Sequence, residues 1–146
     1  MASADDAFGI RPTDRQRADE RIEALAQQSQ LDFEIDFFRR ILDHQPDYLD
    51  VLRCQGELLS RKGLHEQALE VDRRLVRLLP DDCVVQYNLA CSLAVGGLRE
   101  DAISALRAAL AHGYDDFDHL ECDGDLDVLR DEPAYRALLR EYGIMN

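Results

Sequence analysis

The sequence has no apolar run long enough to cross a membrane, and it does not open with the charged, apolar and small-residue succession of a secretory signal. We therefore predict neither a membrane span nor export, and the expected location is the cytoplasm. A C-x-x-C pair is also missing, which argues against a zinc or thioredoxin-like site. We expect the four scattered cysteines to be reduced and to serve as small, buried or partly buried side chains. They are Cys54, Cys83, Cys91 and Cys122.

Catalytic motifs are missing as well. The sequence contains neither H-E-x-x-H nor G-x-S-x-G, and its four histidines are dispersed. The pair Gly96-Gly97 follows a predicted helix, whereas a phosphate-binding loop needs glycines that lead into a helix behind a strand. We therefore expect no catalytic residues, no cofactor and no enzyme activity.

Positive charge is scarce. The chain has 17 Lys and Arg against 30 Asp and Glu, a formal net charge of -13. Phosphate backbones and anionic lipids would repel such a chain, so nucleic acid and membrane surfaces are not expected as partners. The last 33 residues, 114–146, carry ten carboxylates and three arginines, which is -7 of this charge.

Three of these carboxylates, Asp123, Asp125 and Asp127, have the spacing with which a calcium loop begins. Such a loop needs glycine at its sixth position and a carboxylate at its twelfth, and the sequence has Val128 and Ala134 there. The pattern favours helix-capping aspartates on a solvated face, and no metal is expected.

From Leu49 to Gly113 one pattern is written twice, 34 residues apart. Each copy has apolar residues at helical spacing, a glycine, and a second set at the same spacing, which predicts two helices joined by a tight turn. A repeat of this length indicates a unit that stacks on its own copy. The matching pairs are Gly56/Ala90, Leu59/Leu93, Gly63/Gly97, Leu64/Leu98, Glu66/Glu100, Ala68/Ala102 and Leu69/Ile103.

The spacing resembles the tetratricopeptide repeat, a 34-residue helix-turn-helix unit with small residues at the close helix crossing. The resemblance implies an all-α, right-handed α-solenoid of antiparallel helix hairpins. Gln55 and Asp72 depart from the family pattern, and an Asp72 buried without partners would be costly. Gln86 and Tyr114 are further departures. The positions that match are Leu52, Gly56, Leu59, Ala68 and Pro80, then Leu89, Ala90, Leu93, Ala102, Leu106 and Ala109.

We expect a single domain behind a disordered tail at residues 1–12. Residues 13–46 are predicted to form a degenerate first repeat with helices at 13–28 and 31–45; an unrelated capping hairpin is the alternative. Full repeats are expected at 49–82 and 83–113, with Asp81 or Asp82 capping the helix that follows Pro80.

Capping helices are expected over residues 114–146, because a solenoid must cover its last apolar face. Asp131 is the predicted cap of a final helix that starts at Pro133. The string from Asp125 to Tyr135 resembles tails that close many bacterial tetratricopeptide arrays. The apolar residues available for the cover are Phe117, Leu120, Leu126, Leu129, Tyr135, Leu138 and Leu139.

In the resembling family, the first helix of each unit lines a concave groove in which ligand peptides lie. Tyr87 and Asn88 stand out there, as an aromatic platform beside an amide that can bond a peptide backbone. The alternative is that Tyr87 packs between adjacent repeats. The groove residues that the resemblance implies are Asp50, Arg53, Cys54, Glu57, Val84, Tyr87, Asn88 and Cys91.

These patterns predict a non-catalytic adaptor that binds a protein or peptide, with acidic rims favouring a basic partner. One alternative is a chaperone for secreted substrates, which requires a dimer and an apolar groove. Another is a structural homo-oligomer whose groove holds a neighbour's tail, and a third is an enzyme or metal protein that uses the acidic tail.

Overall fold

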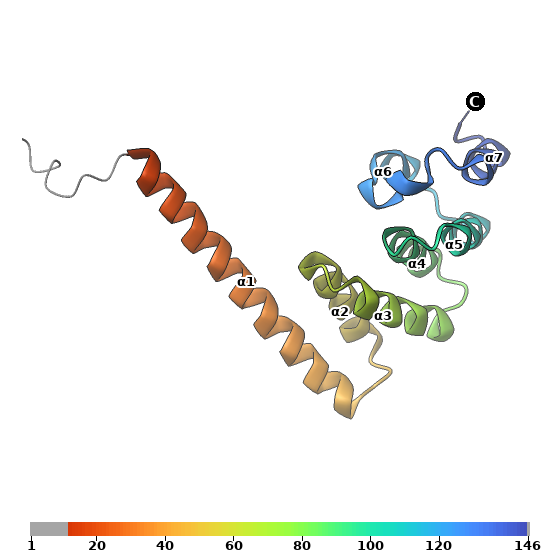
Figure 1. Ribbon diagram of the computed structural model, residues 1–146. Helices are drawn as coiled ribbons and strands as arrows, with labels where there is room; N and C mark the ends of the chain where they lie inside the picture. The colour runs from red at the N-terminus through yellow and green to blue at the C-terminus, as the bar shows by residue number, and fades with distance from the viewer. Residues whose placement is uncertain (1–11, 146) are drawn as a thin grey trace, which may run out of the picture.

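The computed structural model describes residues 12–145, and these residues form helices and no strands (Figure 1). The prediction of an all-helical fold is confirmed. The tail predicted at residues 1–12 lies outside the described residues except for Pro12, where the first helix begins. In chain order the elements are α1 (Pro12–His44), α2 (Leu49–Lys62), α3 (His65–Leu78), α4 (Cys83–Val95), α5 (Arg99–Ala111), α6 (Phe117–Cys122), the 3-10 helix η2 (Gly124–Leu129) and α7 (Pro133–Glu141).

Helix α1 corrects the prediction for residues 13–46. It runs unbroken for 33 residues, so neither a degenerate two-helix repeat nor a capping hairpin is present there. The expected turn fell on Gln28-Ser29-Gln30, which contains no glycine or proline to end a helix. The C-terminal part of α1 packs against α2, while residues 13–30 project away from the other helices (Figure 1).

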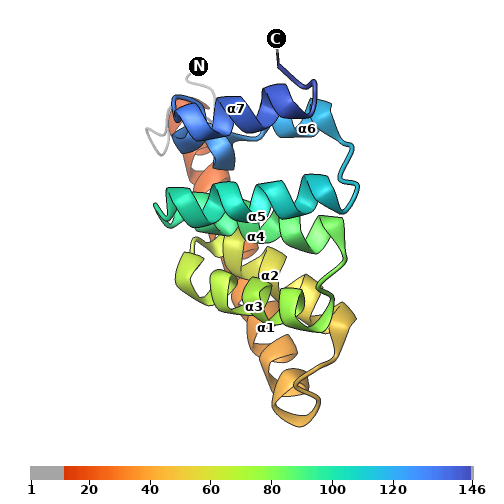
Figure 2. The same ribbon diagram turned by 90° about the vertical axis from the view of Figure 1, so that its right-hand side faces the viewer.

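Helices α2 and α3 form one hairpin, and α4 and α5 form a second that lies against the first (Figure 2). In both hairpins a glycine with positive φ ends the first helix: Gly63 at 82° and Gly97 at 79°. In the first hairpin the backbone amides of Gly63 and Leu64 donate hydrogen bonds to carbonyls in the last turn of α2. In the second hairpin the amides of Gly97 and Leu98, 34 residues later, donate to the last turn of α4 in the same way. The same turn chemistry therefore recurs at the period that the sequence predicts.

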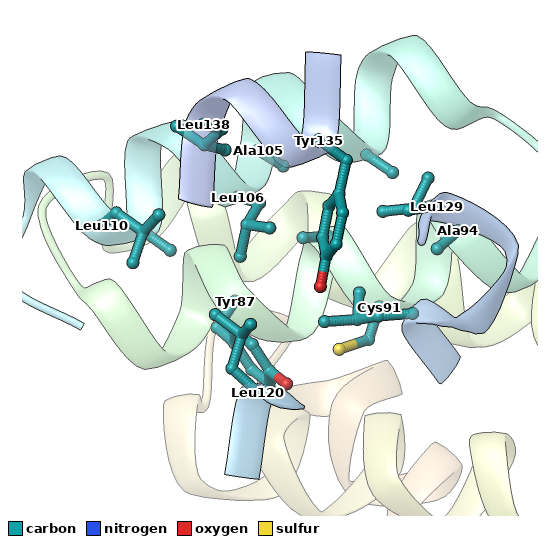
Figure 3. Packing of buried hydrophobic residues seen from close by; sticks show 14 of the residues in the cluster. Tyr87, Cys91, Ala94, Ala105, Leu106, Leu110, Leu120, Leu129, Tyr135 and Leu138 are labelled. Atoms are coloured by element: carbon teal, nitrogen blue, oxygen red, sulfur yellow. The ribbon is translucent and has the colours of Figure 1, made fainter. Parts of the chain in front are cut away.

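The largest apolar core joins α4 and α5 to the C-terminal segment (Figure 3). Ala90, Ala102 and Ala109 are fully buried, as the close crossing of the two helices requires. The acidic C-terminal segment contributes most of the large side chains that this core buries, and Phe117 alone of the apolar residues expected there is exposed. The buried ones are Leu120, Leu126, Leu129, Tyr135, Leu138 and Leu139.

The start of α7 differs from the prediction. Glu132, not Asp131, is its N-terminal flanking residue, and it makes no side-chain capping bond. The Asp131 carboxylate instead accepts a hydrogen bond from Arg136 Nη2 at 3.1 Å. Pro133 opens the helix as expected, and because proline lacks an N–H, the first turn has one donor fewer to cap.

Gln55 and Gln86 are buried where the resembled pattern has apolar residues; the amide nitrogen of each donates a hydrogen bond, whereas Gln55 Oε1 has no partner among the described residues. Gln55 Nε2 donates to the carbonyl of Ile35 at 3.2 Å, which ties α2 to α1. Gln86 Nε2 donates to the carbonyl of Pro80 at 3.0 Å. Each amide therefore stabilises a junction between helices where the family has a hydrophobic contact.

The hydroxyl of Tyr135 is fully buried and has no hydrogen-bond partner among residues 12–145. An orphaned buried hydroxyl costs about 1–3 kcal/mol. We therefore expect Tyr135→Phe to raise the free energy of unfolding by about 1 kcal/mol, measured by urea denaturation. Tyr87→Phe, which removes a hydroxyl that is bonded, is the control and should destabilise; equal effects of the two variants would contradict the assignment.

Candidate binding groove

A groove of about 600 Å³ lies between α2, α4 and the segment that joins α6 to η2. The structure brings six of the eight predicted residues together along it. Val84 lines a smaller neighbouring hollow of about 270 Å³, and Asp50 lines neither hollow. The six lining residues are Arg53, Cys54, Glu57, Tyr87, Asn88 and Cys91.

Arg53 lies at the seam between the two hairpins. Its Nη2 donates to Asp82 Oδ2 at 3.0 Å, while Asp82 Oδ1 caps α4 by accepting the amides of Val84 and Val85 at 3.0 Å each. The Val85 amide first, and then Arg53, hold the pKa of the Asp82 carboxyl below its usual value against the opposing effect of burial. The positive charge of Arg53 is therefore balanced by the Asp82 carboxylate, and it does not make the groove basic.

Tyr87 is not an open aromatic platform. Only 3% of it is exposed, because its ring stacks on Tyr114 with centroids 4.2 Å apart and planes at 3°. Its hydroxyl donates to Asp123 Oδ2 at 2.7 Å. Tyr87 is therefore packed inside the molecule, against the C-terminal segment and not between adjacent repeats, and the ring of a ligand cannot stack on it.

Asn88, the other residue singled out from the sequence, is exposed and lines both hollows. Within residues 12–145 its side-chain amide makes no hydrogen bond. The amide carries two donors and an acceptor, which are the groups that an extended peptide backbone needs. Asn88 thus keeps the recognition chemistry that burial removes from Tyr87.

Asp123 holds the far wall of the groove to α4. Besides Tyr87, it accepts from Cys91 Sγ at 3.5 Å and from the amide of Asp125 at 3.0 Å, and it lies 3.3 Å from His119 Nε2. Burial raises the pKa of the Asp123 carboxyl, but the bonds from Tyr87, Asp125 and Cys91 and the charge of His119 outweigh it and lower the pKa overall. The carboxylate therefore stays ionised.

No local signal in the sequence indicates this role of Asp123, because Tyr87 lies 36 residues away and the spacing of the aspartate is that of a helix cap. It is a cap, through the amide of Asp125, and the same carboxylate reaches across to α4. A cap faces one helix end, whereas Asp123 serves two elements at once.

Asp72 lies at the floor of the groove, buried between α2 and α4. Ser92 Oγ donates to its Oδ2, and Gly56 leaves room for Oδ1: a Cβ on Gly56 would lie 3.2 Å from it. Burial raises the pKa of the Asp72 carboxyl to about 6, although the Ser92 bond acts in the opposite direction. The costly burial anticipated from the sequence is thus offset in part by one hydrogen bond.

Three groups at the groove have ligand atoms within 4.8 Å of one another: Cys91, Asp123 and Asp125. A thiol binds metal as the thiolate, and burial raises the pKa of the Cys91 thiol far above its usual value. Asp123 already accepts three hydrogen bonds. These residues therefore fit a network that holds α4 to the C-terminal segment better than they fit a metal site.

No family model matches the chain. Over 91 residues the chain is 32% identical to a chloroplastic protein of Arabidopsis thaliana. The matched segment is 60% of this chain and 27% of the plant protein, so the chain spans about a quarter of that relative.

None of the helices in residues 12–145 combines the length and the apolar character that crossing a membrane requires.

Proposed function

We propose that this chain is a non-catalytic, tetratricopeptide-like module that binds a basic segment of a partner protein in its groove. The two hairpins with matching glycine turns 34 residues apart support a right-handed α-solenoid with a cap of the bacterial type. The cytoplasm stays the predicted compartment.

The charge of the groove carries this proposal. Glu57 on α2, Asp72 on α3 and Asp125 beyond α6 all line it, whereas Arg53 is paired with Asp82. Burial, followed by the charge of Asp123, raises the pKa of the Asp125 carboxyl. A ligand cation would relieve that repulsion, so ammonium and guanidinium groups are favoured over carboxylates.

A basic peptide fits the remaining features. Its arginine or lysine head would lie between Glu57 and Asp125, and the aliphatic stem would cover the half-exposed Val95, which also lines the groove. The Asn88 amide would bond the peptide backbone. Recognition then combines one charge contact with one backbone contact and needs no aromatic platform.

The alternatives fit less well. A chaperone for secreted substrates needs an apolar groove, and this one is acidic. A groove that holds a neighbour's tail would have to accept residues 114–146, whose net charge is -7. Those residues also bury Tyr135, Leu138 and Leu139 in their own core. The basic segment therefore comes from another protein.

Peptide binding tests the proposal directly. The test uses a panel of labelled peptides that contain arginine, and each peptide is paired with a variant in which glutamine replaces the arginines. We expect the arginine peptide of a pair to bind about tenfold more tightly than its glutamine variant, measured by fluorescence anisotropy. Glu57→Gln and Asp125→Asn should each weaken the tightest pair about fivefold, because each removes one partly exposed charge contact.

The matched control is Asp50→Asn, which removes an equal charge from α2 outside both hollows. It should leave affinity unchanged. Equal losses in Asp50→Asn and Glu57→Gln would show that only net charge matters, and equal binding of the arginine and glutamine peptides would exclude the acidic groove as the site.

A further inference from the structure

Helix α1 carries an apolar face that no other described element covers. It packs against α2 through Leu31, Ile35 and Phe38, and Lys62 pairs with Asp32 at this junction. On its other side, four large apolar side chains are at least half exposed. Their exposed fractions are 65% for Ile22, 65% for Leu25, 66% for Phe33 and 51% for Phe37.

Three of these side chains, Ile22, Phe33 and Phe37, belong to one stripe along the helix, and Leu25 lies beside it. At about 100° per residue, Phe33 and Phe37 each lie on the side of the helix opposite the buried Ile35. The stripe positions are separated by four, three, four and four residues, and at about 100° per residue they fall within an arc of about 80°. They are Ile22, Ala26, Ser29, Phe33 and Phe37.

The exposed length of α1 also calls for a partner. All residues from 13 to 30 are exposed, and a helical stretch of this size has little stability of its own in water. Phe33 and Phe37 stack on each other at 6.3 Å while facing solvent. Covering the stripe would remove this apolar surface from water and hold the helix in place.

We propose that a second copy of this chain covers the stripe, with the two α1 helices antiparallel. The stripe is centred between Ser29 and Gln30, so a two-fold axis there sets Ile22 against Phe37 of the second copy and Ala26 against Phe33 of the second copy. The small Ala26 leaves space for the ring, and the symmetry repeats both contacts. The interface is self-complementary in shape.

Charge supports the same register. The axis sets Asp19 against Arg40 of the second copy, once at each end. Among residues 12–145, Arg40 pairs only with Asp36 on its own helix, at 3.2 Å and exposed to solvent, so it is available. In a parallel pair, Asp19 would instead face Asp19 of the second copy, and Arg40 would face Arg40 of the second copy. The antiparallel pair also keeps the two acidic arrays at opposite ends of the interface, which limits their repulsion.

A lipid surface fits the stripe less well than a second copy does. Membrane-surface helices place lysine and arginine on their polar face, but Asp19, Glu23 and Asp36 flank this stripe. Anionic headgroups would meet these carboxylates as well as the large negative charge of the whole chain. Vesicle binding without self-association would overturn the proposal.

Sedimentation equilibrium tests the dimer. We expect twice the chain mass of 16.6 kDa for the full chain and a single chain mass for Ile22→Glu combined with Phe33→Glu. Gln27→Glu places a negative charge at an exposed position off the stripe and should stay dimeric. Far-UV circular dichroism should show that all variants keep their array helices.

The register is tested by a charge exchange. Asp19→Arg alone should raise the dimer dissociation constant about tenfold, because arginine then faces Arg40 at both ends. Adding Arg40→Asp should restore the wild-type constant. A monomeric wild type, a dimer that tolerates the stripe variant, or a double exchange that fails to restore association would each overturn the proposal.

Groove binding provides an independent readout. Helix α1 lines neither hollow, so arginine peptides should bind the monomeric stripe variant as they bind the wild type. Failure of the dimer and failure of the groove can therefore be told apart.

Discussion

Leu126→Ala is expected to lower the free energy of unfolding by about 3–4 kcal/mol, measured by urea denaturation. Leu126 belongs to a six-residue 3-10 helix in the most acidic part of the chain. If this helix were a surface segment, the substitution would have little effect on stability. Its side chain is fully buried in the core shared with α4 and α5. The large effect follows because alanine leaves a cavity that these helices cannot fill without moving.

Val128→Ala is the matched control, since Val128 is in the same 3-10 helix and only partly buried. Its loss should be less than half as large. A loss below about 1 kcal/mol for Leu126→Ala would mean that η2 packs loosely on α4 and α5. Where Leu126→Ala remains folded, arginine peptides should bind it more weakly, because η2 and the segment before it form one wall of the groove.

Asp72→Asn is expected to stabilise the protein at neutral pH by about 2–3 kcal/mol. The pKa of the Asp72 carboxyl is about 6 in the folded state against 3.8 as its ordinary value. Between these values the folded state binds more protons than the unfolded state, so this group lowers the stability of the wild type as pH rises from about 4 to about 6. An amide has no charge to desolvate and can still accept the Ser92 hydrogen bond.

Paired unfolding curves near pH 4 and near pH 7.5 measure this effect. The advantage of Asp72→Asn should nearly vanish at the acid end, where the wild-type carboxyl is protonated in the folded state and about half protonated in the unfolded state. Ser92→Ala should move the wild-type transition to higher pH, because that hydrogen bond lowers the pKa of Asp72. An equal difference between Asp72→Asn and wild type at both pH values would rule out ionisation as the cause.

The four helices between Leu49 and Ala111 can be predicted from the sequence because their signals are local. Apolar spacing, Gly63 and Gly97 fix each hairpin within a few residues, and all four helices follow that pattern. Local signals also explain why the prediction for helix α1 is wrong. Its apolar spacing changes near Ser29, and without a breaking residue the change marks two faces of one helix, not two helices.

The groove was partly readable because helix phase decides which side chains share a face. Phase alone puts Arg53, Glu57 and Asn88 along one hollow. Helix phase does not say which other segment covers these side chains, so it cannot predict that Tyr114 buries Tyr87. Asp123 was missed because its partners, Tyr87 and Cys91, are brought to it by the packing of the C-terminal segment on α4.

The bond between Tyr87 and Asp123 also constrains how this protein can evolve. An extra hairpin inserted between α5 and α6 would carry Asp123 away from α4. The groove would lose its far wall and Tyr87 its partner in one event. A hairpin inserted beside α2 would leave this bond and the groove wall intact, but it would separate Gln55 of α2 from the carbonyl of Ile35 in α1.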